Sequence, residues 1–197
     1  MKDSYTVIEK PEGISWEKLA ELQVRAHENN HELGIDMHCS HLTGIELRES
    51  VKEGKTYVAI DSVGEPKGML SIEVRQVGRW WHKGKAGYVC YVAVAPECQG
   101  SGLYRKLSAV AYKEMTDANI QVVYLDTHIA NQSAQKAYIK DGFQKVRFSP
   151  GGHDYYAVEM AKWLDGSGKN RFVCSLMFLL TEMAAKILYK PGKIRRF

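Results

Sequence analysis

Two glycines, Gly100 and Gly102, lie in a short polar loop where the chain could bind an anion. The loop follows an apolar run from Tyr88 to Ala95, and apolar residues recur at helical spacing from Leu103 onward. This order predicts a strand, a tight turn and a helix. The N–H groups at the start of such a helix point in one direction, and the helix dipole adds about half a positive charge there. The stretch therefore predicts an anion site, with a pyrophosphate as the expected ligand.

The loop departs from two common phosphate-binding motifs. It lacks the lysine and hydroxyl residue of a P-loop, and Arg105 stands where a dinucleotide-binding fingerprint has its third glycine. It fits the pattern Q-x-x-G-x-G/A instead, with Gln99 and Gly102 in place and Tyr104 in the last position. After a strand that ends V-x-V-x-P, this pattern resembles the acetyl-coenzyme A loop of the GNAT N-acetyltransferases. The alternative interpretation is a plain tight turn.

A second motif lies further along the chain. The run N-x-x-A-x-x-x-Y-x-x-x-G-F starts at Asn131 and contains Tyr138 and Gly142. Asn131 is suited to cap a helix, and Gly142 is suited to its left-handed end. The run is similar to the second coenzyme A motif of the same family, and two motifs in the right order are more specific than one. The resemblance covers about residues 5–164.

The resemblance implies an α/β protein with the GNAT fold. In that fold a mixed, mostly antiparallel central sheet of six to seven strands is flanked by about four helices, and this chain adds a C-terminal helix. The expected organisation is an acetyltransferase domain over residues 1–164, then a linker and an apolar, basic helical extension over 165–197. The implied reaction is transfer of an acetyl group from acetyl-coenzyme A to a primary amine of a small molecule or peptide, by direct attack on the thioester.

The resemblance also implies roles for residues of the two motifs. Backbone groups of Val92, Ala93 and Val94 would hold the pantetheine arm and polarise the thioester. Asn131 would hold the same arm, and Tyr138 would face the sulfur. The pyrophosphate would be wrapped by residues of the loop and of the helix start: Gln99, Gly100, Ser101, Gly102, Leu103, Tyr104 and, as a charge partner, Arg105.

Two of these positions need comment. Tyr104 stands where the family has Gly or Ala, so its side chain must point away from the phosphates or narrow the site. Tyr138 lies seven residues from Asn131, which places both on one helix face. Proton transfer from a phenol to a thiolate is uphill by about 2 kcal/mol, so we expect Tyr138 mainly to hydrogen-bond the departing sulfur. The alternative for Tyr138 is a half-buried core tyrosine.

The general base is left open. Some relatives carry a Glu on the central strand, where this chain has Tyr88. Glu73, His82, Asp126 and solvent are the candidates. Two alternative functions follow. One is a non-catalytic acyl-coenzyme A sensor that lacks a base. The other is an interaction or membrane-docking protein that binds its partner through residues 172–197.

Composition limits the remaining possibilities. A net charge of +4 is too small and too scattered to indicate nucleic-acid binding. The four cysteines show no C-x-x-C spacing, and the N-terminal residues show no apolar secretory signal, so we expect reduced thiols in a cytoplasmic protein. The histidine pairs His27/His31 and His38/His41 are joined by no strong constellation of carboxylates or cysteines apart from the lone Cys39, so no metal site is expected.

Other segments have simpler expectations. Ser15 should cap a helix, and a second helix should run over about residues 43–51. We expect acceptor contacts from residues 29–44, from a loop over 76–85 that carries Trp80-Trp81-His82, and from a hairpin over 148–154.

The tail has a different pattern. Residues 172–189 are strongly apolar, with Ser175, Glu182 and Lys186 on one narrow helical stripe, and a basic end follows. The apolar run is interrupted too early for a spanning helix, which needs about 20 residues. The first interpretation is a helix packed on its own domain or on a second subunit as a homodimer. The other is a helix that lies on a membrane surface.

Overall fold

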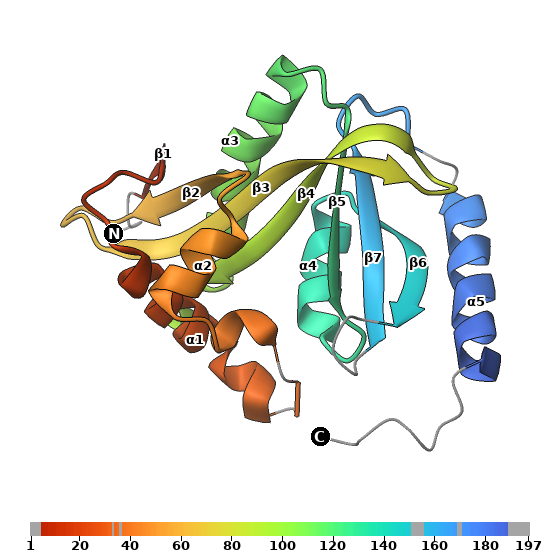
Figure 1. The fold of residues 1–197 in the computed structure, drawn as a ribbon, viewed down its shortest axis with the longest axis horizontal. Helices are drawn as coiled ribbons and strands as arrows, with labels where there is room; N and C mark the ends of the chain where they lie inside the picture. Colours follow the sequence, from red (N-terminus) through yellow and green to blue (C-terminus); the bar gives the residue numbers. More distant parts are fainter. Residues whose placement is uncertain (1–4, 33, 36, 151–155, 169–170, 189–197) are drawn as a thin grey trace. The chain divides into compact units, whose positions relative to one another are not determined.

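A computed structural model of the chain describes residues 5–32, 34–35, 37–150, 156–168 and 171–188 (Figure 1). Seven strands form one mixed, mostly antiparallel sheet in the order β1-β2-β3-β4-β5-β7-β6. The strands are β1 (Thr6–Glu9), β2 (Lys55–Ile60), β3 (Pro66–Gly78), β4 (Lys83–Val94), β5 (Val122–His128), β6 (Gln144–Pro150) and β7 (Tyr156–Trp163). The α-helices of the described residues are α1 (Trp16–Glu32), α2 (Gly44–Ser50), α3 (Leu103–Asp117), α4 (Gln132–Lys140) and α5 (Arg171–Leu188). The predicted fold class, with its extra C-terminal helix, is confirmed.

The chain divides into two compact units. The first comprises Met1–Val74 and Gly87–Asn119, and the second comprises Arg75–Ala86 and Ile120–Phe197. Strands β3 and β4 contribute to both units because the boundaries fall inside them. The predicted domain boundary after residue 164 stays a prediction.

In the first unit the helices begin where their capping residues predict. Ser15 Oγ accepts the N–H of Lys18 at 3.3 Å at the start of α1. Thr43 and Glu46 form a reciprocal capping box at the start of α2, with distances of 3.3 and 2.8 Å. Helix α1 extends to Glu32, so the first residues of the segment 29–44, from which acceptor contacts are expected, are helical. A short 3₁₀ helix over His38–Ser40 follows.

Helix α3 is fixed to strand β2 by apolar and polar contacts. Leu103, Leu107 and Ala111 are spaced by one turn, and all three are buried. Further along α3, Glu114 accepts a hydrogen bond from the hydroxyl of Tyr57 and pairs with Lys55 at 2.6 Å. These contacts hold α3 in a defined position on the sheet.

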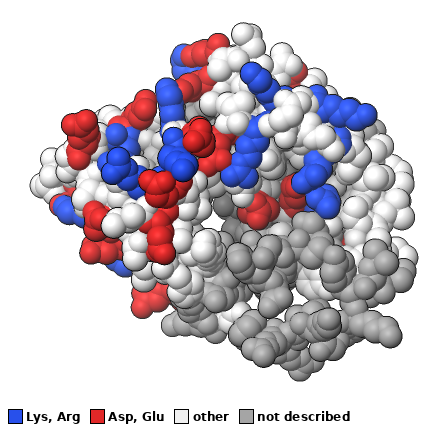
Figure 2. All heavy atoms as spheres, in the orientation of Figure 1, with Lys and Arg blue, Asp and Glu red and all other residues white. Residues whose placement is uncertain are grey.

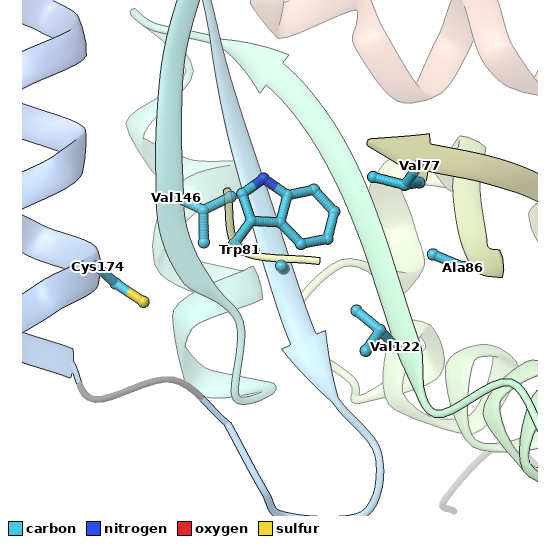
Figure 3. Packing of buried hydrophobic residues seen from close by; sticks show 7 residues of the cluster. Val77, Trp81, Ala86, Val122, Val146 and Cys174 are labelled. Carbon is cyan, nitrogen blue, oxygen red and sulfur yellow. The ribbon is translucent and has the colours of Figure 1, made fainter. Parts of the chain in front are cut away.

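The second unit is built around Trp81, which is 1 % exposed (Figure 3). Its indole N–H donates to Glu159 Oε1 at 2.9 Å, and Tyr124 and Trp163 pack against its ring. Buried apolar side chains complete this cluster: Val77, Ala86, Val122, Val146, Ala161 and Cys174.

The prediction of a loop over residues 76–85 is wrong. Strand β3 continues to Gly78 and β4 starts at Lys83, so only a tight turn joins them, with Arg79 and His82 paired through their backbones at 2.8 and 3.2 Å. Trp81 turns into the core because burying a large aromatic ring is strongly favourable. It is therefore not available to stack on an acceptor, and the acceptor contact expected from it is withdrawn.

Helix α5 lies alongside β6 (Figure 1). Thr181 Oγ1 accepts the backbone N–H of Phe148 at 2.9 Å, and the rings of Phe148 and Phe178 meet edge to face at 6.2 Å. Cys174 and Ala185 are buried on the same face of the helix, and Figure 3 shows Cys174 pointing toward Val146. Of the helices in the described ranges, none combines the length and the apolar character that crossing a bilayer requires.

Candidate active site

Strand β4 carries an unusual backbone conformation at Tyr91, where φ is 49°. Positive φ is uncommon for residues other than glycine and changes the direction of the strand. The carbonyl oxygen of Tyr91 accepts a hydrogen bond of 2.8 Å from Nε2 of Gln23 on α1. The predicted thioester-binding residues, Val92 to Val94, follow directly after this kink. The kink and Gln23 were both missed by the sequence analysis, since a contact across 68 positions leaves no local pattern.

The loop after β4 is held by its own side chains. Nε2 of Gln99 donates to the carbonyl oxygens of Val94 and Ala26, at 3.2 and 3.3 Å. Ser101 Oγ donates to the carbonyl oxygen of Cys98 at 2.6 Å. The side chain of Gln99 thus anchors the loop to β4 and to α1.

Gly100 and Gly102 have φ angles of 77° and 85°. A Cβ atom at either position would meet no neighbour within 4 Å, so the backbone conformation is what requires glycine here. Gly102 is the N-cap of α3, and no side chain caps this end. The first hydrogen bond of the helix runs from the N–H of Lys106 to the carbonyl of Gly102 at 3.2 Å. The amides before Lys106 thus have no intrahelical acceptor, which is the arrangement that binds phosphate.

Tyr104 does not obstruct this end of the helix. Its hydroxyl lies 3.0 Å from the hydroxyl of Tyr112, two turns further along α3. The ring must therefore run along the helix toward its C-terminal end. The side chain points away from the amides of the first turn, which is one of the two arrangements that the sequence left open.

The charges beside the loop are balanced. Glu97 forms ion pairs with Arg25 and Lys67, each at 3.1 Å. The backbone N–H of Glu97, and then the ammonium of Lys67, hold the pKa of Glu97 below its ordinary value, while Glu97 raises the pKa of Lys67. Glu97 is therefore ionised near neutral pH, but its two partners offset the repulsion that it would exert on a phosphate.

Asn131 lies in the second unit, at the start of α4. Its Oδ1 accepts the N–H of Ala134 at 3.1 Å, as predicted for an N-cap, and the residue is 8 % exposed. Within the described ranges, no acceptor is recorded for its Nδ2 group, which leaves a hydrogen-bond donor for a ligand. Gln135 secures the preceding turn, because its Nε2 donates to the carbonyls of His128 and Ile129 at 3.2 and 2.7 Å.

Tyr138 lies two turns after Asn131 and is half-buried. Its ring is 5.9 Å from the ring of Phe143, at an angle of 60°. The helix ends as predicted at Gly142, where φ is 99°, and the N–H of Phe143 returns to the carbonyl of Tyr138 at 3.0 Å. This closed end fixes the backbone that carries the phenol.

The candidate bases lie in different elements. Glu73, on β3 in the first unit, is 7 % exposed. In the second unit His82 stacks on Trp81, and its Nε2 lies 3.0 Å from the carbonyl of Lys85. Asp126 is on β5, opposite Glu159 of β7. The base stays open among these residues and solvent.

His128 is a titratable residue that the sequence analysis did not single out. Its Nδ1 accepts the N–H of Ala130 at 3.1 Å. Burial lowers the pKa of His128, so the neutral ring with a proton on Nε2 is favoured. Because Nδ1 already accepts a hydrogen bond, the neutral ring is better suited to donate a hydrogen bond from Nε2 than to act as a base.

Two open cavities lie outside the motifs. One, of about 360 Å³ in the second unit, is lined among others by Trp80, His82 and Trp163. The other, of about 340 Å³ in the first unit, is lined among others by Trp16 and Arg48. Neither is lined by a residue of the two coenzyme A motifs, so the cavities do not define the candidate site. The acceptor contacts expected from Trp80 and His82 stay a prediction, and the predicted hairpin over 148–154 lies mostly outside the described residues.

The sequence matches the acetyltransferase (GNAT) family model over residues 16–143, which is more than half of the chain. The protein therefore belongs to the GNAT acetyltransferase family, and this membership implies acyltransferase activity. The matched region contains both motifs. No curated protein matches the sequence.

Solved structures share the fold at low identity. A GNAT-family acetyltransferase from Staphylococcus aureus Mu50 has a TM-score of 0.63 and 17 % identity, with 82 % of this chain and 99 % of that chain covered. An IAA acetyltransferase from Bacillus cereus ATCC 14579 has a TM-score of 0.57 and 18 % identity, with 82 % of this chain and 100 % of that chain covered. A chain of the NatC complex bound to Gag peptide and CoA has a TM-score of 0.56 and 15 % identity, with 82 % of this chain and 99 % of that chain covered. These likenesses concern the fold alone.

Proposed function

We propose that the protein transfers an acetyl group from acetyl-coenzyme A to a primary amine of a small molecule or peptide. The observation that carries this proposal is the start of α3, where two glycines of positive φ lead into a helix end without a side-chain cap. Such an end binds a pyrophosphate through backbone amides. The NatC structure, which shares the fold, contains CoA.

The proposed roles follow the two motifs. The segment from Gln99 to Tyr104, with Arg105 as a charge partner, binds the pyrophosphate. The N–H groups of Gln99 and Ser101 donate to the carbonyls of Pro96 and Cys98 at 3.2 and 3.3 Å, so the amides at the start of α3 make the contacts to phosphate. Backbone groups of Val92, Ala93 and Val94 hold the pantetheine arm and polarise the thioester carbonyl. The Nδ2 group of Asn131 supports the same arm, because Oδ1 makes the helix cap and Nδ2 donates to no residue of the described ranges.

The chemistry is a direct displacement. The neutral amine attacks the thioester carbonyl carbon and the C–S bond breaks. The bonded nitrogen loses a proton to solvent to form the amide, and the leaving thiolate is stabilised by a hydrogen bond from Tyr138 until it takes up a proton from solvent. The amine must first lose a proton, since the ordinary pKa of an alkylamine is about 10.4. Solvent, Glu73, His82 or Asp126 takes that proton. No metal ion is required for these steps.

Calorimetry and a turnover assay test the proposal together. Titration with coenzyme A and acetyl-coenzyme A should release heat from folded protein, and absence of heat with both ligands would overturn it. Free thiol should then appear above the hydrolysis background with at least one member of a panel of primary amines. Binding of the ligand without thiol release across the panel would favour the sensor.

The non-catalytic acyl-coenzyme A sensor is the second candidate. It is favoured by one feature, which is Tyr88 at the place where some relatives carry a catalytic Glu. We further propose a cytoplasmic location, which the lack of C-x-x-C spacing among the four cysteines supports. Lys and Arg side chains are interspersed with Asp and Glu on the face shown in Figure 2, which supports a small ligand rather than nucleic acid.

A further inference from the structure

Helix α5 has a second apolar face that points away from β6. This face is called the outer face of α5 and consists of Phe172, Val173, Leu176, Leu179, Leu180 and Met183. These side chains are 44–74 % exposed, and they make up six of the twelve large apolar side chains that are exposed in the described part of the chain. Contiguous apolar patches of this kind mark interaction sites.

The spacing of the residues explains why two faces are apolar. Cys174, Phe178, Thr181 and Ala185 repeat at helical spacing and pack on β6, whereas Phe172, Leu176, Leu179 and Met183 repeat on the opposite side. Packing on the unit needs only the first set. The second set is not explained by the fold of the described residues.

The charges around α5 indicate what covers the outer face. Lys169 and Arg171 stand at the start of the helix in sequence, and Lys186 stands in its last turn. The nine residues that follow, 189–197, contain four cations and no Asp or Glu: Lys190, Lys193, Arg195 and Arg196. Within α5 itself, Glu182 is the single acidic residue. Both ends of the apolar face are therefore flanked by positive charge.

This charge distribution distinguishes two occupants. A second copy packed on the outer face, in either helix direction, would bring the basic end of one copy against a basic end of the other. An anionic lipid surface would instead meet both ends with opposite charge. A helix with an apolar face and flanking Lys and Arg lies in the interface plane of such a membrane, with the cations at the headgroups.

We propose that α5 and residues 189–197 dock the protein on an anionic lipid surface. The outer face of α5 enters the boundary between headgroups and acyl chains, and the cations of the tail contact the lipid phosphates. The contact is peripheral and depends on salt, since screening weakens the attraction between the cations and the headgroups. This inference does not depend on the proposed acetyl transfer.

Co-sedimentation of the full-length protein with vesicles tests the proposal. The vesicles are phosphatidylcholine alone or phosphatidylcholine with phosphatidylglycerol, at about 0.1 M and about 0.5 M salt. We expect binding to the anionic vesicles, weaker binding at high salt, and little binding to the neutral vesicles. The double variant Leu176→Asp, Met183→Asp should lose at least about tenfold in affinity, because two side chains no longer enter the apolar layer.

Two further variants make the test specific. Replacing the four cations of residues 190–196 by Glu should abolish the preference for anionic vesicles without touching the helix. Ile45→Asp, on α2 in the first unit, is the matched control, because Ile45 is a 72 % exposed apolar residue outside the tail and should bind as the parent does. Circular dichroism verifies that each variant is folded.

Three results would overturn the proposal. They are no binding of the parent protein to anionic vesicles, equal binding to both vesicle types, or unchanged binding of both the Leu176→Asp, Met183→Asp variant and the variant with Glu in place of the four cations. Sedimentation velocity tests whether a second copy of the protein binds to the outer face of α5 instead. A dimer of the parent protein that dissociates in the double variant, together with absent vesicle binding, would assign the outer face of α5 to a second copy.

Discussion

The side-chain amide of Gln23 donates a hydrogen bond of 2.8 Å to the carbonyl oxygen of Tyr91. Gln23 is fully buried on α1, and Tyr91 is a non-glycine residue of β4 with positive φ. A backbone conformation of this kind costs about 1–3 kcal/mol and persists only where surrounding contacts hold it. The bond from Gln23 is such a contact, and it acts immediately before the residues proposed to hold the thioester.

Replacing Gln23 with Leu should therefore affect both stability and the site. The change removes the donor and leaves the carbonyl of Tyr91 without it, which should lower the free energy of unfolding by about 1–3 kcal/mol. The proposed acetyl-coenzyme A affinity should fall as well, because the kink at Tyr91 loses its support. Urea denaturation and calorimetry measure the two effects. The same substitution at Gln76, an exposed position on β3, should change neither quantity, and equal results for both variants would contradict the role of Gln23.

The glycine at the start of α3 gives a second prediction. Gly102→Ala forces a side chain into φ of 85°, which should cost about 1–2 kcal/mol through the backbone alone, since no atom lies near the added Cβ. Because the amides of the first turn would shift, affinity for coenzyme A should fall as well. Gly64→Ala is the matched control, with φ of 84° and open space around the Cβ in a turn of the first unit. Gly64→Ala should lose similar stability but keep the affinity for coenzyme A. An equal loss of this affinity in both variants would contradict the proposal that the start of α3 binds the pyrophosphate.

Local chemistry allowed much of the fold to be predicted. Capping by Ser15 and Asn131, the breaks at Gly100 and Gly142, and the apolar spacing in α3 depend on neighbouring residues, and the structure contains these features. The strand preceding the loop and the extra C-terminal helix follow from apolar runs in the same way.

Features that depend on distant residues could not be predicted. The sequence around Arg79 predicts a long loop because Trp80 and His82 are aromatic or polar. Trp81 is instead buried in the core, where its indole N–H donates to Glu159, 78 positions away. The contact of Gln23 with Tyr91 is equally remote. The packing of α5 on β6 could not be chosen in advance either, because both faces of that helix are apolar.

Tyr138 can be tested by removing only its hydroxyl. If the phenol hydrogen-bonds the departing thiolate, Tyr138→Phe should lower kcat by about 10- to 100-fold, which corresponds to a charged hydrogen bond of about 1.5–3 kcal/mol. KM and the affinity for coenzyme A should change little. Tyr156→Phe, on β7 in the same unit, is the control and should retain kcat. The core-tyrosine alternative predicts the reverse for Tyr138→Phe, with lower stability and unchanged kcat.

Cys39 makes a prediction about pH. Burial raises the pKa of its thiol from 9.0 to about 12 in the folded protein. In the unfolded chain the thiol ionises near its ordinary pKa, whereas in the folded chain it stays protonated. The unfolded state therefore binds fewer protons above pH 9, and folding stability should fall as the pH rises from 9 toward 12, by at most about 1.4 kcal/mol per pH unit. Cys39→Ala removes this contribution, so the difference in urea midpoint between parent and variant should change between pH 8 and pH 10 in favour of the variant. Cys39 and Cys90 are both half-buried residues of the same unit, so Cys90→Ala serves for comparison. A difference between the parent and Cys39→Ala that is independent of pH would contradict the raised pKa of the Cys39 thiol.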